Sequence, residues 1–274
     1  IDQQKKTAGP DFAPDIQATF GAEWQTYQAI LPEHQKEFEQ YFDLAASQSF
    51  RGKRVCDLGC GNGRRSYFLR NLCREMVLVD FSDAIFVARK NLADSRHCLF
   101  FQCDLKQLPF RENFADFLFC LGVLHHLPTP CLAEIRMLKK FAPTLLIYLY
   151  YNLDNRPFYF RWLFGIITLL RRQTSRVHRP FLRKVFSLAG VYGLYRPLIY
   201  LGFLLNPLGL SKYIPLYEAY HDKSRRRIEQ DVYDRFFTGI EQRVSRKDIL
   251  QLQKDFAVVK ISDQPPFYHF LCQN

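Results

Sequence analysis

The sequence contains no apolar run approaching the roughly 20 residues that a membrane-spanning helix needs. Nothing at its start resembles a signal peptide. Its eight cysteines include no Cys-x-x-Cys pair, and they are scattered through expected strands and helices. This scatter favours buried, reduced thiols over disulfides or a metal site. We therefore expect a cytoplasmic protein without bound metal, built as one domain with an elaboration.

The most informative stretch is an apolar run that leads into glycines at alternate positions. Residues 55–58 predict a buried strand, and Gly59, Gly61 and Gly63 follow directly. Glycine permits positive φ and lets a ligand lie against the main chain. A helix is expected from about Arg64. Strand, glycine turn and helix together form the nucleotide-binding corner of a doubly wound α/β sheet.

The glycine spacing argues against a dinucleotide. A dinucleotide fingerprint requires glycine at the sixth position, which counted from Gly59 is Arg64. An acidic residue inside the strand, Asp57, would also sit badly beside a pyrophosphate. It suits a ligand that carries a cationic amine near the turn.

Two further carboxylates follow the next expected strands. The strand at 76–79 ends in Asp80, which is placed to accept hydrogen bonds from two ribose hydroxyls. The strand at 98–102 is followed by Asp104, which can accept from an exocyclic adenine amine. Amine, ribose and adenine in this order describe S-adenosylmethionine.

Four stretches now support a family resemblance. They are VCDLGCGNGR at 55–64, LVDFSDAIFVARKN at 78–91, FFQCDLKQLPF at 100–110 and ADFLFCLGVLHHLP at 115–128. In this order the chain resembles a class I S-adenosylmethionine-dependent methyltransferase, of the bacterial small-molecule type 11 group that includes quinone-biosynthesis enzymes. The resemblance implies an α/β fold with a Rossmann-like, seven-stranded, doubly wound sheet whose last strand is antiparallel.

The resemblance also implies roles for individual residues. Asp57 would hold the methionine amine, Asp80 the ribose, and Asp104 the adenine edge. The remaining implied cofactor contacts are Gly59 and Gly61 under the methionine, Phe81 on the adenine, the Leu105 amide, and the backbone of Leu121.

The composition of the chain divides it into four segments. We expect an N-terminal helical cap at 1–49, the S-adenosylmethionine-binding core at 50–150, an inserted helical lid at 151–244, and a last helix with a closing hairpin at 245–274. From Tyr151 to Lys247 there are 18 Lys/Arg and 7 Asp/Glu, whereas the rest of the chain has 20 of each. All the excess positive charge therefore lies between Tyr151 and Lys247, the stretch that contains the inserted segment.

The inserted segment is also rich in aromatic and apolar residues. Its prolines, at positions 157, 180, 197, 207 and 215, predict several short helices. We interpret it as a lid over the carboxyl end of the sheet, where ligands of such folds bind. The core then resumes with a helix near Ser245 and strands at 258–261 and 267–271.

Few residues are candidates for catalysis, because methyl transfer is an in-line displacement that depends mainly on positioning. A base is needed only for an acceptor that stays protonated. His125 or His126, after the fourth strand, and Tyr151, at the end of the fifth, are the candidates. The residues expected to line the acceptor site are Trp24, Tyr27, Tyr217 and His221.

The acceptor is expected to be a small molecule, hydrophobic or anionic, methylated on O, N or C. The Asn/Asp-Pro-Pro-aromatic run of base-methylating enzymes is replaced here by Leu121-Gly122-Val123-Leu124. A basic, apolar lid also suits contact with the inner face of a membrane. The alternatives are an RNA methyltransferase that uses the basic lid, or a non-catalytic S-adenosylmethionine-binding scaffold.

Overall fold

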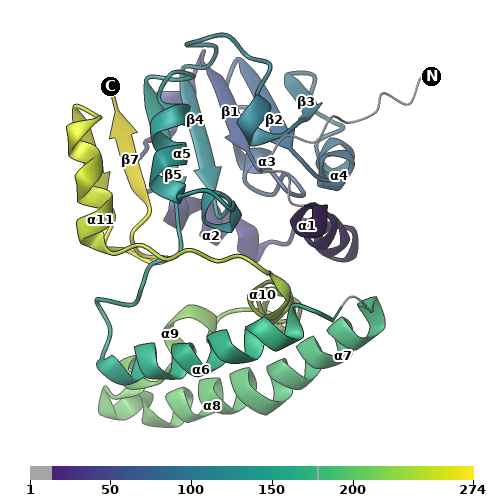
Figure 1. The fold of residues 1–274 in the computed structure, drawn as a ribbon, viewed down its shortest axis with the longest axis vertical. Coiled ribbons are helices and arrows are strands. Elements are labelled where there is room, and N and C mark those ends of the chain that lie inside the picture. Colours follow the sequence, from purple (N-terminus) through teal and green to yellow (C-terminus); the bar gives the residue numbers. More distant parts are fainter. Residues whose placement is uncertain (1–13, 178) are drawn as a thin grey trace.

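A central sheet and a separate group of helices make up the molecule (Figure 1). The computed structural model describes residues 14–177 and 179–274. Residues 1–13 of the expected N-terminal cap lie outside the described residues. The helices α6 to α10, which we call the helical layer, lie across the end of the sheet to which the parallel strands point (Figure 1).

The sheet has seven strands in the order β3-β2-β1-β4-β5-β7-β6. Every pairing is parallel except those that β7 makes with β5 and β6. The expected doubly wound sheet with an antiparallel last strand is thus confirmed. The strands are β1 (Arg54–Leu58), β2 (Glu75–Asp80), β3 (Cys98–Gln102), β4 (Phe117–Leu121), β5 (Thr144–Tyr148), β6 (Val258–Ile261) and β7 (Phe270–Gln273).

Successive strand residues face opposite sides of the sheet, and each side is covered by helices. Cys56 and Leu58 pack with Ile135 of α5 and Ile249 of α11, whereas Val55 packs with residues of α3 and α4 on the other side. The helices around the sheet are α1 (Pro14–Thr26), α2 (Glu33–Tyr41), α3 (Ser66–Leu69), α4 (Ala84–Asn91), α5 (Cys131–Leu138) and α11 (Arg246–Leu250).

Local signals account for two of these helices. α11 begins where expected, because Ser245 and Asp248 form a reciprocal capping box at its start. α3 is only one turn long, shorter than the expected helix from Arg64, because the chain must reach the start of β2 at Glu75 within a few residues. Short 3₁₀ turns lie at Ser47–Phe50, Leu105–Gln107, Leu124–His126, Asn206–Leu208, Ser211–Tyr213 and Gln251–Lys254.

The helical layer departs from the expectation of several short helices. Its elements are α6 (Phe158–Thr174), α7 (Pro180–Gly190), a π-helical turn (Val191–Tyr195), α8 (Arg196–Leu205), α9 (Tyr217–Tyr220) and α10 (Arg225–Phe237). α7, the π turn and α8 run on as one helix that continues to Leu208. In the π turn the amide of Arg196 bonds to the carbonyl of Val191, five residues back. This wider turn accommodates Pro197, which has no N–H to donate.

This continuous helix corrects a second expectation. The helix Phe181–Leu208 is 28 residues long and contains an 18-residue window with a mean hydropathy of 1.4, so by length and composition it can cross a membrane. The prediction that no such segment exists was wrong, because Pro197 interrupts the sequence pattern without ending the helix.

The helical layer has its own core and is tied to the rest of the molecule by polar contacts. Val191, Tyr195, Ile228, Val232 and Phe237 are among its fully buried residues. Contacts to the first two helices and to the end of β5 come from α10. They are the pairs Arg227–Glu37, Gln230–Glu23 and Asp234–Tyr150.

Candidate active site

A cavity of about 660 Å³ lies between the carboxyl ends of the parallel strands and the helical layer. It receives residues from the turn after β1, the ends of β2 and β4, the segment after β5, and helices α1, α6 and α10. Its volume lies within the range of small-molecule sites, roughly 300–1,000 Å³. Ligands of open α/β sheets bind at this edge.

The glycine turn after β1 forms part of the cavity wall. Gly59, Gly61 and Gly63 have φ of 73°, 55° and 78°, which side-chain-bearing residues rarely adopt. A Cβ added to Gly61 would lie 2.7 Å from the ring of Trp24, and one added to Gly59 would overlap Val123. Gly59 lines the cavity, whereas Gly61 is covered by Trp24 and does not.

Asp80 lies at the end of β2 and faces the cavity. Its carboxylate accepts hydrogen bonds from the Gly61 amide at 2.8 Å, the Ser82 amide at 2.9 Å and the Ser82 hydroxyl at 2.7 Å. The Phe81 amide also donates to this carboxylate. A carboxylate offers about four acceptor positions, so ribose hydroxyls, as the sequence suggested, would have to share these positions with the protein donors or displace some of them.

Asp57 does not line the cavity. It is 3% exposed, lies beneath the glycine turn, and accepts a hydrogen bond from the Ser66 hydroxyl at 2.6 Å. Burial raises the pKa of Asp57 to about 7, although the Ser66 hydrogen bond opposes the shift. Contact with the methionine amine, as the resemblance implied, would require the turn above Asp57 to move.

The raised pKa of Asp57 predicts a pH-dependent stability. Because its carboxyl holds a proton more tightly in the folded chain, this contribution is full at low pH and is lost as the pH rises through 7. The loss amounts to at most about 1.4 kcal/mol per pH unit. We expect Asp57→Asn, which keeps the Ser66 contact, to flatten the fall in unfolding free energy between about pH 4 and 7. An equal slope in both proteins would contradict this.

The residues expected at the adenine end lie together, since Phe81, Asp104 and Leu105 all line the cavity beside Asp80. Leu121, which was expected at the methionine end, lines the cavity as well. One oxygen of Asp104 accepts from the Lys106 amide at 2.9 Å and caps the short turn at Leu105–Gln107. Its other oxygen is available to an adenine amine.

Arg64 is a site residue that the sequence did not reveal. It is buried, lines the cavity, and lies with its guanidinium 5.2 Å from the ring of Trp24. Its Nε and Nη1 have no hydrogen-bond partner among the described residues. Buried donors of this kind require an acceptor, and a ligand carboxylate is the natural one. The only signal was its place after the glycines, where it appeared merely as a departure from the dinucleotide pattern.

Of the two candidate histidines after β4, His125 does not reach the cavity. His125 is fully buried, does not line the cavity, and its ring lies 4.0 Å from that of Tyr150 and 4.1 Å from that of His126. Burial also lowers its pKa strongly. His125 therefore does not face the site, because the turn at Leu124–His126 directs it into the core.

His126 is the histidine that reaches the cavity. Its Nδ1 lies 2.8 Å from the carbonyl oxygen of Ile240. A carbonyl oxygen can only accept, so Nδ1 carries the proton and Nε2 is left as a proton acceptor.

The remaining expected residues divide into two groups. Tyr151, Trp24 and His221 line the cavity. Tyr27 and Tyr217 do not, because both are buried in the core of the helical layer. Tyr217 packs there against Gly202, and Tyr27 lies near Tyr233.

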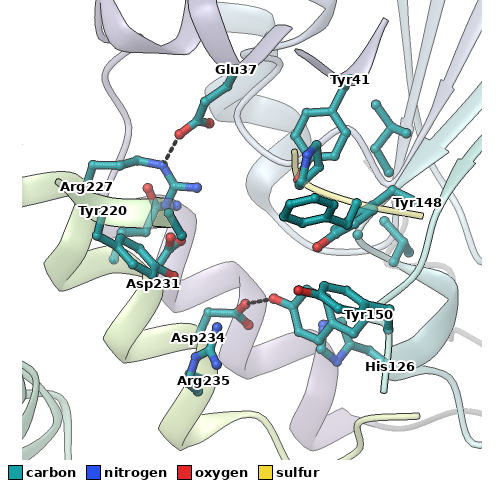
Figure 2. A pocket seen from close by; sticks show the side chains of 18 of the residues that line it. Glu37, Tyr41, His126, Tyr148, Tyr150, Tyr220, Arg227, Asp231, Asp234 and Arg235 are labelled. Atoms are coloured by element: carbon teal, nitrogen blue, oxygen red, sulfur yellow. Dashed lines mark hydrogen bonds and ion pairs between the residues drawn. The ribbon is translucent and has the colours of Figure 1, made fainter. Parts of the chain in front are cut away.

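A polar cluster on α10 faces the cavity, and the sequence did not predict it (Figure 2). Arg227 pairs with Glu37 at 2.8 Å and also with Asp231. The hydroxyl of Tyr150 donates to Asp234 at 2.7 Å. Burial, reinforced by the charge of Asp234, raises the pKa of Tyr150 well above its usual range, so its phenol stays protonated.

A buried glutamate lies next to this cluster. Glu23 is 4% exposed and accepts from the Gln230 side chain at 2.9 Å. Burial, and then the charge of Asp234, raises the pKa of Glu23 to about 8. The cavity thus combines two unbonded donors on Arg64 with the carboxyl of Glu23, whose raised pKa favours the protonated form near neutral pH.

These residues fit S-adenosylmethionine. Asp80 can accept from the ribose, Asp104 from the adenine, and Arg64 can donate to the methionine carboxylate. The unpaired donors of Arg64 require an anionic ligand group, which this cofactor carries.

Comparison with known proteins agrees with this fit. Residues 56–140 match the family model described as a methyltransferase domain. A tRNA U34 carboxymethyltransferase of Campylobacter curvus is 29% identical over 37% of this chain and 34% of its own length. A ubiquinone biosynthesis O-methyltransferase of Coxiella burnetii is 29% identical over 52% of this chain and 57% of its own. A solved SAM-dependent methyltransferase from Aquifex aeolicus is 19% identical, covering 53% of this chain and 84% of that one, with a TM-score of 0.41.

The chain spans a third to somewhat more than half of the length of these two curated relatives. The substrates in their names therefore apply to those proteins. The matched domain, the strand order and the glycine turn are nevertheless consistent with one another. Residues 56–140 form a methyltransferase domain, and the sheet has the Rossmann-like topology of the class I S-adenosylmethionine-dependent methyltransferases.

Proposed function

We propose that this protein transfers a methyl group from S-adenosylmethionine to an oxygen, nitrogen or carbon atom of a small molecule bound under the helical layer. The observation that carries this proposal is one cavity that runs from the cofactor residues to the inner faces of α6 and α8. Phe160, Leu163, Phe164, Ile167 and Leu198 line its far part, which suits an acceptor with an apolar portion.

The residues of the chain contribute mainly by position. When bound, S-adenosylmethionine supplies an electrophilic methyl group on a good leaving group. Asp80, Asp104 and Arg64 fix the cofactor against the strand ends. The helical layer holds the acceptor and excludes water. His126, whose Nε2 is free to accept, is our proposed base for a hydroxyl acceptor. Tyr151 remains a second candidate.

One prediction tests the cofactor's orientation. Arg64→Met should weaken S-adenosylhomocysteine binding by about 10- to 100-fold, since a charged hydrogen bond contributes roughly 1.5–3 kcal/mol. Binding of 5′-methylthioadenosine, which lacks the amino-acid group, should hardly change. Calorimetry with both ligands measures the difference. An equal loss for both ligands would show that Arg64 does not contact the carboxylate.

The acceptor class can be tested with radiolabelled S-adenosylmethionine and a cell extract. We expect label in the organic-soluble fraction with the wild-type protein and not with Asp80→Ala. Label in RNA would favour the alternative that the tRNA-modifying relative suggests. Cofactor binding without label in either fraction would favour the non-catalytic scaffold.

The exposed character of the helical layer favours the small-molecule proposal over RNA. Its outward side chains include Phe158, Trp162 and Phe181, all at least 70% exposed, whereas an RNA-binding face would present mainly charge. We also propose that the protein works in the cytoplasm, peripheral to the inner face of a membrane.

A further inference from the structure

Helix α6 leaves a row of large apolar side chains uncovered. Phe158 is 76% exposed, Trp162 70% and Leu169 61%, and Ile166 lies between them on the same helix face. Apolar residues at this spacing normally bury themselves against a core. Nothing among the described residues covers this row.

The continuous helix of α7 and α8 leaves a second such row. Phe181 is 75% exposed, Tyr200 66%, Leu204 58% and Leu208 69%, and Val185 is also exposed. The row therefore extends along the full length of the helix. Exposed apolar surface on this scale marks an interaction site rather than ordinary surface.

Both rows lie on the side of the helical layer that faces away from the sheet. The opposite faces of the helices point inward, since Leu163 and Ile167 of α6 and Leu198 of α8 line the same cavity. In Figure 1 these helices form the part of the molecule farthest from the strands. We call the two rows together the outer face.

The charge around the outer face has one sign. From Asn155 to Tyr217 the sequence has no acidic residue and ten Lys/Arg. Seven of these are exposed: Arg161, Arg172, Arg176, Arg179, Lys184, Arg196 and Lys212. Basic residues flanking an apolar surface complement a membrane that carries anionic lipids, where each contributes about 1 kcal/mol.

Contacts on its inner side hold the continuous helix against the rest of the helical layer, so the helix is not free to cross a bilayer. Arg183 is buried and donates to the Val177 carbonyl at 2.6 Å and to the Tyr233 hydroxyl at 3.2 Å. Gly190 packs closely on Val232, and Gly202 on Tyr217. To span a membrane, the helix would have to break these contacts and expose the core of the helical layer.

We propose that the outer face docks on the surface of a membrane that contains anionic lipids, with α6 and the 181–208 helix lying in the interface plane. The outer face is thus the surface through which the protein would be peripheral to a membrane. Membrane binding is measured without cofactor or acceptor, so its test does not depend on methyl transfer.

The test is flotation with vesicles of phosphatidylcholine alone, or mixed equally with phosphatidylglycerol. We expect binding to the mixed vesicles, weakened by high salt and reversed by alkaline extraction. The double substitution Trp162→Glu/Leu204→Glu should lower the vesicle partition more than about tenfold, as the loss of two buried apolar anchors implies. Met137→Glu on α5, 59% exposed but outside the outer face, is the matched control and should bind normally.

A second measurement covers the case in which the double variant misfolds. The chain has two tryptophans, so in Trp24→Phe the emission reports Trp162 alone. We expect a blue shift with the mixed vesicles and quenching by brominated lipids. Four results would overturn the proposal: no vesicle binding, binding that survives alkaline extraction, an unchanged Trp162 emission, or a dimer in place of vesicle binding.

Discussion

Replacing Asp80 by alanine is expected to lower the affinity for S-adenosylhomocysteine by about 10- to 150-fold, equivalent to roughly 1.5–3 kcal/mol. The carboxylate holds the Gly61 amide at 2.8 Å and the Ser82 amide at 2.9 Å, so its loss removes a ribose acceptor and also loosens the glycine turn. Calorimetric titration measures the change.

Asp83→Ala provides the control for this substitution. Asp83 lies three residues further on, is exposed, and its carboxylate accepts a hydrogen bond from the Gln102 side chain. The affinity of the Asp83→Ala protein for S-adenosylhomocysteine should match that of the wild type. An Asp80→Ala protein with normal affinity and an intact fold would remove Asp80 from the cofactor site.

Replacing Arg227 by methionine is expected to reduce the unfolding free energy by about 3–5 kcal/mol. Arg227 and Glu37 are each at most 9% exposed and lie 2.8 Å apart, so the substitution leaves a buried carboxylate with weaker compensation. Burial alone would raise the pKa of Glu37, but the charge of Arg227 holds this pKa well below its usual range. Lys223, 3.5 Å from Glu37, offsets part of the loss.

Thermal unfolding measures this effect, and a decrease of about 10 °C is expected for a chain of this size. The surface pair Arg246–Asp263 offers the comparison, because both side chains are substantially exposed. Arg246→Met should change the melting temperature only slightly. Similar effects for the two substitutions would show that the Arg227–Glu37 pair does not join the helical layer to α2 as described.

The core of the fold follows from local sequence features. The apolar run at β1 and the glycines after it predict the strand and the turn, since only glycine fits beside Trp24 and Val123. Asp80, Asp104 and Leu121 follow strands whose carboxyl ends meet at one edge, so their convergence on a cavity could be predicted as well. Periodicity and turn chemistry were sufficient for these elements.

The acceptor side of the site could not be predicted in this way. Arg227, Gln230, Asp231 and Asp234 form a polar face on α10, and such a face is normally solvated. Here it faces a cavity, because the opposite apolar face packs into the helical layer. Only the tertiary arrangement decides which face is inward.

A crystal structure with bound S-adenosylhomocysteine would show whether these residues form the cofactor site. We expect the ribose on Asp80, the adenine beside Phe81 and Asp104, the carboxylate on Arg64, and the sulfur open to the space under α6 and α10. A ligand bound elsewhere, or a glycine turn closed by side chains with Arg64 out of contact with the ligand, would rule this site out.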